Sequence, residues 1–210
     1  MTRPLIISDC DEVLLHMVSP FKVWLEASQG VDFNLDGHNF AEALRWQKSG
    51  ELLEPADIWK MLGRFFDTEM DNQTPIPGAV EAINALSEHA DVVILTNLVD
   101  ERREKRAEQL ARVGIHAPVY TNQGPKGPPL KAILEEHGAS RRALFIDDLA
   151  QHHVSVRETA PDVLRLHMCG EPTIASAINC AHKSGDADAR IDRWDEALPW
   201  IMEQFERSPA

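Results

Sequence analysis

Five short apolar runs recur along the chain, and four of them end in polar residues. They cover residues 5–7, 91–96, 119–121, 143–146 and 163–168. Apolar runs of this length that are bounded by polar residues are typical of buried strands. Segments with apolar residues at helical spacing cover residues 79–87, 101–113, 130–137 and 194–205. This alternation predicts an α/β fold: a Rossmann-like parallel sheet with helices on both faces.

Residues 16–74 interrupt the alternation because they contain no strand-like apolar run. Apolar clusters predict three helices here, around Phe21, around Phe40 and Leu44, and over residues 58–66. The sequence Pro-Ile-Pro-Gly at positions 75–78 then marks the return to the sheet. We therefore expect a small helical cap, residues 16–74, inserted after the first strand of a core formed by residues 1–15 and 75–210.

The charge balance narrows the possible partners. The 210 residues include 21 Lys and Arg against 34 Asp and Glu, a formal net charge of −13. Such a surface repels phosphate backbones and anionic lipid, so neither nucleic acid nor a membrane is an expected partner. The three cysteines form no CxxC pair, and no apolar run resembles a signal peptide or a membrane span, so we expect a cytoplasmic protein. An anionic substrate would require a local positive charge, which a bound divalent metal would supply.

Asp9 and Asp11 directly follow the first predicted strand. Alternate residues of an extended segment point the same way, so both carboxylates could face one pocket. Such a pair could act as nucleophile and general acid/base. A solvated turn rich in aspartate is the alternative interpretation.

Asp147 and Asp148 end another predicted strand and could join Asp9 in a cluster of carboxylates. Carboxylates without positive partners repel one another, so such a cluster indicates a cation, and hard oxygen ligands favour Mg²⁺. The alternative is a helix N-cap. Both interpretations can hold together, with Asp147 on the metal and Asp148 on the backbone or on a lysine.

Two further strand ends carry candidate phosphate-binding residues. Thr96 and Asn97 offer a hydroxyl and a backbone N–H at an expected helix N-terminus, although an N-cap or turn would look the same. Lys126 lies in a loop rich in Gly and Pro before a helix, whereas Lys131, its nearest competitor, lies inside that helix. An ordinary exposed lysine is the alternative interpretation of Lys126.

Taken in order, these four motifs resemble those of the haloacid dehalogenase-like superfamily of hydrolases. The matching residues are Asp9-Cys10-Asp11-Glu12-Val13, Thr96-Asn97, Lys126 followed by Gly127-Pro128-Pro129, and Asp147-Asp148. The resemblance implies a Rossmann-like core with a cap and an Mg²⁺-dependent phosphatase that hydrolyses a small phosphorylated metabolite through an aspartyl-phosphate. Asp11 is the second aspartate of the first motif, and the resemblance implies a phosphatase because phosphatases of the family have this residue and its dehalogenases lack it.

The resemblance also implies a role for each matching residue. Asp9 would be the nucleophile and Asp11 the general acid/base. Thr96, Asn97 and Lys126 would bind the phosphoryl oxygens. The metal would be held by Asp9, the backbone carbonyl of Asp11, Asp147 and, directly or through water, Asp148.

The chain departs from the family pattern at two places. Glu12 stands where the family very often has Gly, so its side chain could crowd the loop or reach toward the cap. Gln151, His152 and His153 occupy the region where a further acid often follows the last motif.

Four cap cations, Arg45, Lys48, Lys60 and Arg64, could meet an anionic substrate. A phosphomutase, a phosphonatase or a non-catalytic member that binds a phosphorylated ligand are the alternative functions.

Overall fold

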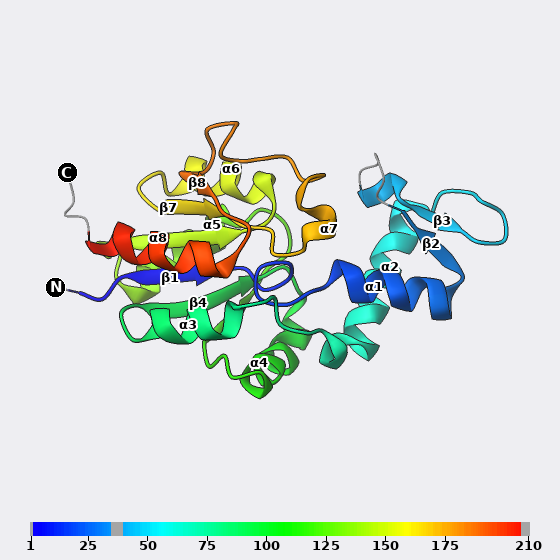
Figure 1. Ribbon diagram of the computed structural model, residues 1–210, viewed down its shortest axis with the longest axis horizontal. Helices are drawn as coiled ribbons and strands as arrows, with labels where there is room; N and C mark the ends of the chain where they lie inside the picture. Colours follow the sequence, from blue (N-terminus) through cyan, green and yellow to red (C-terminus); the bar gives the residue numbers. More distant parts are fainter. Residues whose placement is uncertain (1, 35–39, 207–210) are drawn as a thin grey trace.

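The computed structural model describes residues 2–34 and 40–206. Its main sheet contains six parallel strands in the order β5-β4-β1-β6-β7-β8 (Figure 1). They span Leu5–Ser8 (β1), Asp91–Thr96 (β4), Val119–Thr121 (β5), Ala143–Asp147 (β6), Leu164–His167 (β7) and Ala189–Arg190 (β8). The first five strands confirm the prediction. The sequence did not predict β8, because a two-residue strand in a polar segment leaves no apolar run.

Helices cover both faces of this sheet, as predicted. They are α3 (Ala79–Ser87), α4 (Arg103–Arg112), α5 (Gly127–His137), α6 (Ala150–Thr159) and α8 (Trp194–Glu206). Side chains alternate along a strand, so Ile6 of β1 packs in one cluster with α3 and α8, whereas Leu5 and Ile7 pack in another with α5 and α6. No helix in the described parts of the chain has the length and apolarity that crossing a membrane requires.

The segment between β1 and α3 is not purely helical. It contains α1 (Val18–Trp24), a π-helical turn (Leu25–Gln29), β2 (Val31–Phe33), a 3₁₀ turn (Phe40–Glu42), β3 (Leu44–Trp46), α2 (Pro55–Thr68) and a second 3₁₀ turn (Met70–Asn72). The predicted helix around Phe40 and Leu44 is wrong, because β3 pairs with β2 in an antiparallel hairpin. Strands of three residues offer too few positions to distinguish a period of 2 from one of 3.6.

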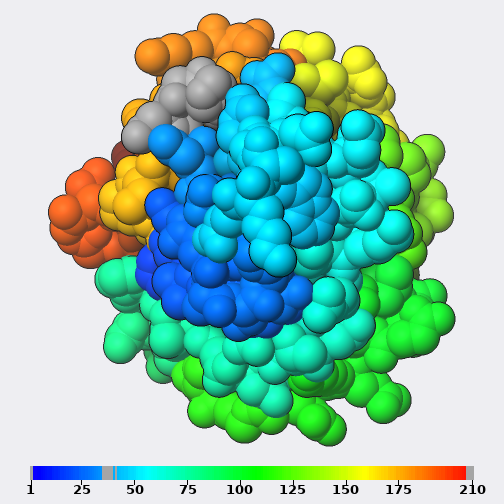
Figure 2. All heavy atoms as spheres, turned by 90° about the vertical axis from the view of Figure 1, so that its right-hand side faces the viewer, coloured from blue at the N-terminus to red at the C-terminus, as the bar shows by residue number. Residues whose placement is uncertain are grey.

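This inserted segment has a hydrophobic cluster of its own. The ring centroids of Phe21 in α1 and Phe65 in α2 lie 5.2 Å apart, and both side chains are fully buried. Figure 1 shows α1 and α2 beyond the carboxyl end of β1, and in Figure 2 the blue and cyan residues of the segment form the front of the molecule. The inserted segment therefore lies over the edge of the sheet at which the candidate residues are found.

Candidate active site

The sheet order brings three candidate motifs to one edge. β1 lies between β4 and β6, so the loop after β1 meets the ends of both neighbouring strands. The backbone N–H of Asp9 donates to the carbonyl of Ile146 at 2.8 Å, which ties the loop to β6. Ligands bind at the carboxyl ends of strands in open parallel sheets, where neighbouring crossovers diverge.

Lys126 joins two of the acidic motifs. Its Nζ lies 2.7 Å from Asp9 Oδ1 and 2.7 Å from Asp147 Oδ2, and its side chain is fully buried. Burial favours a neutral amine, but the two carboxylates raise the pKa of Lys126 above its usual value, so the lysine is charged. Lys131, by contrast, is exposed on α5. The geometry thus brings Lys126, and not its competitor, to the carboxylates.

Gly127 allows the helix after Lys126 to approach its neighbour closely. A Cβ at this position would come within 2.3 Å of the Ser155 carbonyl oxygen in α6. The Gly127 N–H donates to Ser155 Oγ at 3.0 Å instead. This contact between α5 and α6 fixes where the helix begins, and so where Lys126 lies.

Three buried carboxylates, Asp9, Asp147 and Asp148, have oxygens within 4.8 Å of one another. Burial raises the pKa of Asp9 to about 7, although Lys126 acts in the opposite direction. Burial, and then repulsion from Asp147 and Asp9, raise the pKa of Asp148 well above its usual range. One lysine among three carboxylates leaves an excess of negative charge. This donor set fits a divalent cation with a preference for oxygen, such as Mg²⁺.

The two aspartates at the end of β6 divide their contacts differently from the prediction. Asp147, rather than Asp148, bonds the lysine, and its Oδ1 accepts from the Leu149 N–H at 2.9 Å. Burial alone would raise the pKa of Asp147, but Lys126, then His152 and His153, lower it. In the turn after β6, the Leu149 N–H points back toward Asp147. The backbone conformation of this turn, which the sequence pattern does not reveal, determines that direction.

Thr96 and Asn97 have different surroundings. The Thr96 hydroxyl is fully buried and has no hydrogen-bond partner among the residues that the structure describes. An orphaned hydroxyl at the end of β4, the strand next to β1, is suited to an oxygen of a bound anion. Asn97 is exposed, and its side-chain amide donates to the Gly124 carbonyl at 3.1 Å and thereby holds the loop before Lys126.

The helix predicted over residues 101–113 is present as α4, but it does not begin at Thr96 or Asn97. A 3₁₀ turn, Asp100–Arg102, precedes α4, which starts only at Arg103. The prediction of a helix N-terminus at Thr96-Asn97 is therefore wrong. The charge-rich sequence after Asn97 has helical spacing, but it does not reveal where the first helical hydrogen bond forms.

The carboxylate of Asp11 lies against a residue that the sequence did not single out. Arg106 of α4 places its Nη2 3.1 Å from each Asp11 oxygen, and Gln73 Nε2 donates to Asp11 Oδ1 at 2.8 Å. Asp11 is accordingly not part of the cluster around Asp9. Arg106 lies in a run of charged residues that looks like an exposed helix face, so no local signal indicated its burial.

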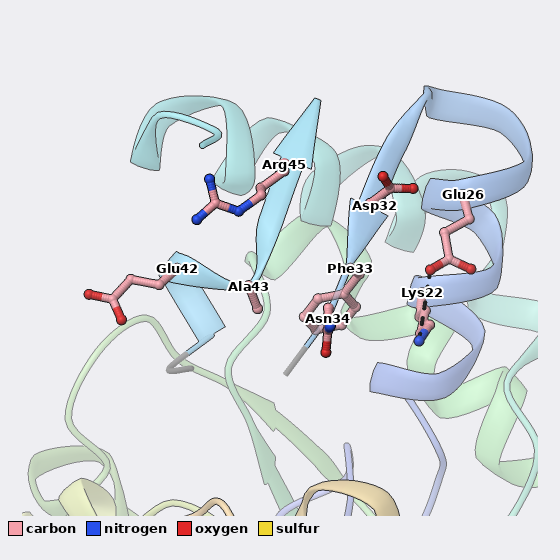
Figure 3. A pocket seen from close by; sticks show the side chains of 8 residues that line it. All are labelled: Lys22, Glu26, Asp32, Phe33, Asn34, Glu42, Ala43 and Arg45. Atoms are coloured by element: carbon pink, nitrogen blue, oxygen red, sulfur yellow. Dashed lines mark ion pairs between the residues drawn. The ribbon is translucent and has the colours of Figure 1, made fainter. Parts of the chain in front are cut away.

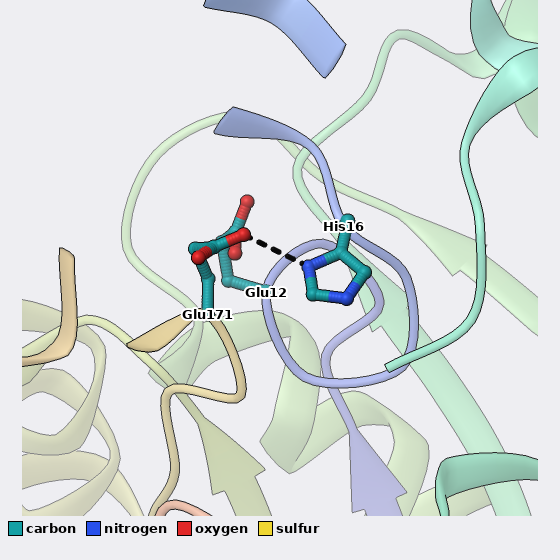
Figure 4. A group of neighbouring side chains, drawn as sticks. All are labelled: Glu12, His16 and Glu171. Carbon is teal, nitrogen blue, oxygen red and sulfur yellow. Dashed lines mark hydrogen bonds and ion pairs between the residues drawn. The ribbon is translucent and has the colours of Figure 1, made fainter. Parts of the chain in front are cut away.

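Glu12 reaches into the inserted segment (Figure 4). Its backbone has a φ of 61°, in the left-handed region, and its side chain is only 2% exposed. Glu12 Oε1 accepts from the backbone N–H groups of Met17 and Val18, and so caps the first turn of α1. Burial, opposed by these two hydrogen bonds, raises the pKa of Glu12 to about 7. The sequence left two possibilities for Glu12, crowding of the loop or reach toward the cap. The structure shows the second, because the side chain reaches toward the inserted segment.

A second acidic residue faces Glu12 at the junction of core and inserted segment. Glu171 Oε2 lies 3.0 Å from His16 Nδ1 (Figure 4). It also accepts from Ser19 Oγ at 2.7 Å. Glu171 follows β7, whereas His16 and Ser19 lie at the start of the inserted segment. These contacts hold the first of the two chain connections between the core and the inserted segment in place.

The two histidines of the last motif are buried in α6. His153 Nε2 donates to the Asp147 backbone carbonyl at 3.0 Å. His152 Nε2 lies 3.3 Å from the side-chain amide of Asn97. Both side chains thus support the backbone and loops around the carboxylate cluster.

The four cap cations lie apart from the carboxylate cluster. Arg45 lines a cavity of about 510 Å³ within the inserted segment (Figure 3). Its guanidinium donates to the Gly50 carbonyl. Lys60 pairs with Asp57, and the Arg64 guanidinium lies 5.9 Å from the centre of the Trp24 ring. Lys48 is exposed. The walls of the cavity carry acidic as well as basic side chains, so the cavity is not a concentrated positive site.

Part of the chain matches a model of the family that the motifs resemble. Residues 66–154 match a family model described as haloacid dehalogenase-like hydrolase. That range contains Thr96, Lys126 and the aspartates of β6, whereas Asp9 lies outside it. A search of curated protein sequences finds no match to this chain.

Solved structures share the fold across nearly the whole chain. A haloacid dehalogenase-like family hydrolase from Streptococcus pneumoniae has 14% identity and a TM-score of 0.66, over 95% of this chain and 98% of that one. A protein from Lactobacillus plantarum assigned as a phosphoglycolate phosphatase has 18% identity and a TM-score of 0.64 over 95% and 99%. One from Thermotoga maritima assigned as a β-phosphoglucomutase has 16% identity and a TM-score of 0.63, also over 95% and 99%.

The fold and the site define an α/β protein whose buried acidic residues gather at the carboxyl edge of a parallel sheet. Residues 66–154 thus resemble the haloacid dehalogenase-like hydrolases in sequence, and the chain as a whole shares the fold of solved structures described as members of that family.

Proposed function

We propose that the chain is an Mg²⁺-dependent phosphatase that hydrolyses a small phosphorylated metabolite through an aspartyl-phosphate on Asp9. The observation that carries the proposal is the buried arrangement of Lys126 between Asp9 and Asp147, with Asp148 beside them. The phosphatase and phosphomutase assignments of the structural neighbours support phosphate esters as the substrate class. The cytoplasmic location expected from the sequence is part of the proposal.

Asp9 is the nucleophile in this proposal. Its Oδ1 accepts hydrogen bonds from the Cys10 N–H at 2.7 Å and from Lys126, which orients the carboxylate. Lys126 and the buried Thr96 hydroxyl would bind phosphoryl oxygens, which offsets the repulsion between phosphate and Asp9. Attack by Asp9 on phosphorus releases the alcohol and leaves an aspartyl-phosphate, and a water molecule then hydrolyses it.

Asp11 serves as general acid/base in both steps. It protonates the leaving oxygen in the first step and removes a proton from the attacking water in the second. We assign Mg²⁺ to Asp9, Asp148, Asp147 and the Asp11 backbone carbonyl, where it would supply positive charge to the transferring phosphoryl group. Asp148 is the favoured direct ligand of the β6 pair, because Asp147 already bonds Lys126 and a backbone amide.

The inserted segment serves as a cap in this proposal. It lies over the carboxyl edge of the sheet, and Glu12 and Glu171 fasten its first connection. A cap in this position would exclude bulk water from the aspartyl-phosphate and would select the substrate.

Acid quench followed by intact-protein mass spectrometry tests the covalent step. Asp11→Asn retains the shape of the side chain and the backbone carbonyl but removes the group that activates water. With Mg²⁺ and an aryl phosphate, this variant should accumulate a phosphorylated species, whereas Asp9→Asn, its matched control, should not. Absence of the adduct in Asp11→Asn, together with unchanged turnover of alkyl phosphates, would contradict the mechanism.

A phosphomutase is the second candidate, and the neighbour from Thermotoga maritima favours it. The same adduct would then pass its phosphoryl group to a second sugar phosphate rather than to water. Release of inorganic phosphate at the rate at which substrate is consumed distinguishes a phosphatase from a mutase. Lys48 and Lys60 are both exposed, and Lys60 pairs with Asp57, so no observation favours a phosphonatase with a cap lysine.

A further inference from the structure

We propose that Arg106 is the positioning residue for Asp11, and that Gln73 couples the Asp11 carboxylate to the inserted segment. The proposal rests on the proposed function, because it concerns the acid/base of that reaction. It adds two residues that lie outside all four motifs.

Arg106 is held almost entirely by the first motif. Its side chain is fully buried, its Nη2 lies 3.1 Å from both Asp11 oxygens, and its Nη1 donates to Cys10 Sγ at 3.3 Å. Asp11 is the one carboxylate in an ion pair with Arg106 among the residues that the structure describes. Burying a guanidinium is costly unless it is paired. Arg106 and Asp11 therefore hold each other in place.

The second half of the inserted segment touches this ion pair, and Gln73 links the pair to the start of the segment. Gln73, at the end of the segment, donates to Asp11 Oδ1 at 2.8 Å and to the carbonyl of His16, at its start, at 3.1 Å. The Phe66 ring in α2 lies 5.5 Å from Arg106 Cζ. A displacement of the inserted segment relative to the core would change at least one contact of the Asp11 carboxylate.

This arrangement has a consequence for the chemistry. A carboxylate that accepts from a guanidinium and an amide has a fixed direction, and acid/base catalysis depends strongly on direction. Both proton transfers of the proposed reaction pass through Asp11. Altering Arg106 should therefore reduce the rate of these transfers while leaving phosphate binding at Thr96 and Lys126 unchanged.

The chain offers a matched control in Arg102. Arg102 also ties the start of α4 to the inserted segment, through Asp67 at 2.8 Å, but it does not contact Asp11. Arg106→Lys and Arg102→Lys both preserve charge. Arg106→Lys changes the ion pair with Asp11, the proposed acid/base, whereas Arg102→Lys changes the ion pair with Asp67.

Steady-state kinetics with an alkyl and an aryl phosphate provide the test. Arg106→Lys should lower kcat for the alkyl phosphate by about 10-fold or more, with KM nearly unchanged, and should have a smaller effect on the aryl phosphate, whose leaving group needs less protonation. Gln73→Met should have the same pattern at smaller size. In an Asp11→Asn background, Arg106→Lys should cause no further loss, because the group that it positions has gone.

Two results would overturn the proposal. One is an equal loss from Arg106→Lys in the presence and absence of the Asp11 carboxylate, which indicates a general structural role. The other is a loss in Arg102→Lys as large as that in Arg106→Lys. Rates are compared per folded molecule, with the folded fraction taken from circular dichroism.

Hydrogen exchange separates this proposal from the proposed function. Protection of residues 70–73, which lie beyond the Asp67 contact of Arg102 and include Gln73, should fall in Arg106→Lys and Asp11→Asn but not in Arg102→Lys. Unchanged protection in all three variants would refute the coupling to the inserted segment. A parent protein that hydrolyses no phosphate ester in the presence of Mg²⁺, but shows this exchange pattern, would refute the proposed function and leave the coupling in place.

Discussion

The carboxyl edge of the sheet and the inserted segment above it are constructed in different ways. At the sheet edge, Asp9 directly follows β1, and Thr96 and Asp147 end the two strands paired with it, so that Ser8 is level with both Ile94 and Ile146. In the inserted segment, a hairpin with three-residue strands and two helices surround a cluster of aromatic rings. The sheet fixes its polar side chains through backbone pairing, whereas the segment fixes its fold through side-chain packing.

The difference indicates how the two regions divide their work. Charged groups at the sheet edge are buried and contact one another, so a small displacement of any one of them changes the electrostatics of all. Charged groups of the inserted segment are mostly exposed or paired locally, as Lys60 is with Asp57. The chemistry should therefore be sensitive to single changes in the core, and selection of the substrate should respond gradually to changes in the segment.

The largest expected effect is removal of the metal. The three clustered carboxylates carry more negative charge than Lys126 can balance, so turnover should fall to background in EDTA and return with added Mg²⁺. Phosphate release measured in both conditions, with circular dichroism as the control for folding, checks this. Full turnover in metal-free buffer would contradict the assignment of the cluster.

Lys126→Ala should have the next largest effect. Loss of a preorganised positive contact to a phosphoryl group typically costs about 10²–10³-fold in kcat. Stability should fall as well, by about 3–5 kcal/mol in metal-free buffer, because Asp9 and Asp147 lose their buried partner. The exposed Lys131 is the control, and Lys131→Ala should leave both quantities nearly unchanged. A larger effect at Lys131 would move the third motif to that residue.

Phe65→Ala tests whether the packing of the inserted segment is separate from the sheet. The ring contacts Phe21, Trp24 and Phe66, so its removal should reduce the free energy of unfolding by about 3–5 kcal/mol. Phe145→Ala in β6 removes a buried ring of the same size and is the matched control. Urea titration should show similar losses, but kcat for an aryl phosphate should fall more in Phe145→Ala. The reverse order would contradict the division between the two regions.

The smallest expected effects come from the cap cations. Replacement of Arg45, Lys48, Lys60 or Arg64 by Ala should raise KM for the natural substrate by a few-fold at most, since exposed ion pairs contribute about 0–1 kcal/mol. Hydrolysis of a small aryl phosphate should not change. Equal effects on both substrates would indicate that none of these cations contacts the substrate.

The sequence by itself determined the strands that precede the chemistry and the residues at their ends. Runs such as residues 91–96 are apolar because both faces of the strand are covered. The local sequence pattern alone therefore indicates that such a strand is buried. The order of the motifs was sufficient to predict that Lys126 and the aspartates of β6 belong with Asp9. Periodicity likewise predicted α3 with its observed bounds.

Only the tertiary structure decided which partner each polar group takes. Arg106 lies 95 residues from Asp11, and its charged neighbours made it look exposed until α4 packed against the loop after β1. The division of contacts between Asp147 and Asp148, and the reach of Glu12 to the start of α1, depend on backbone direction over one or two residues. A local pattern records which side of an element is buried, but pairing between distant segments depends on how the whole chain closes around them.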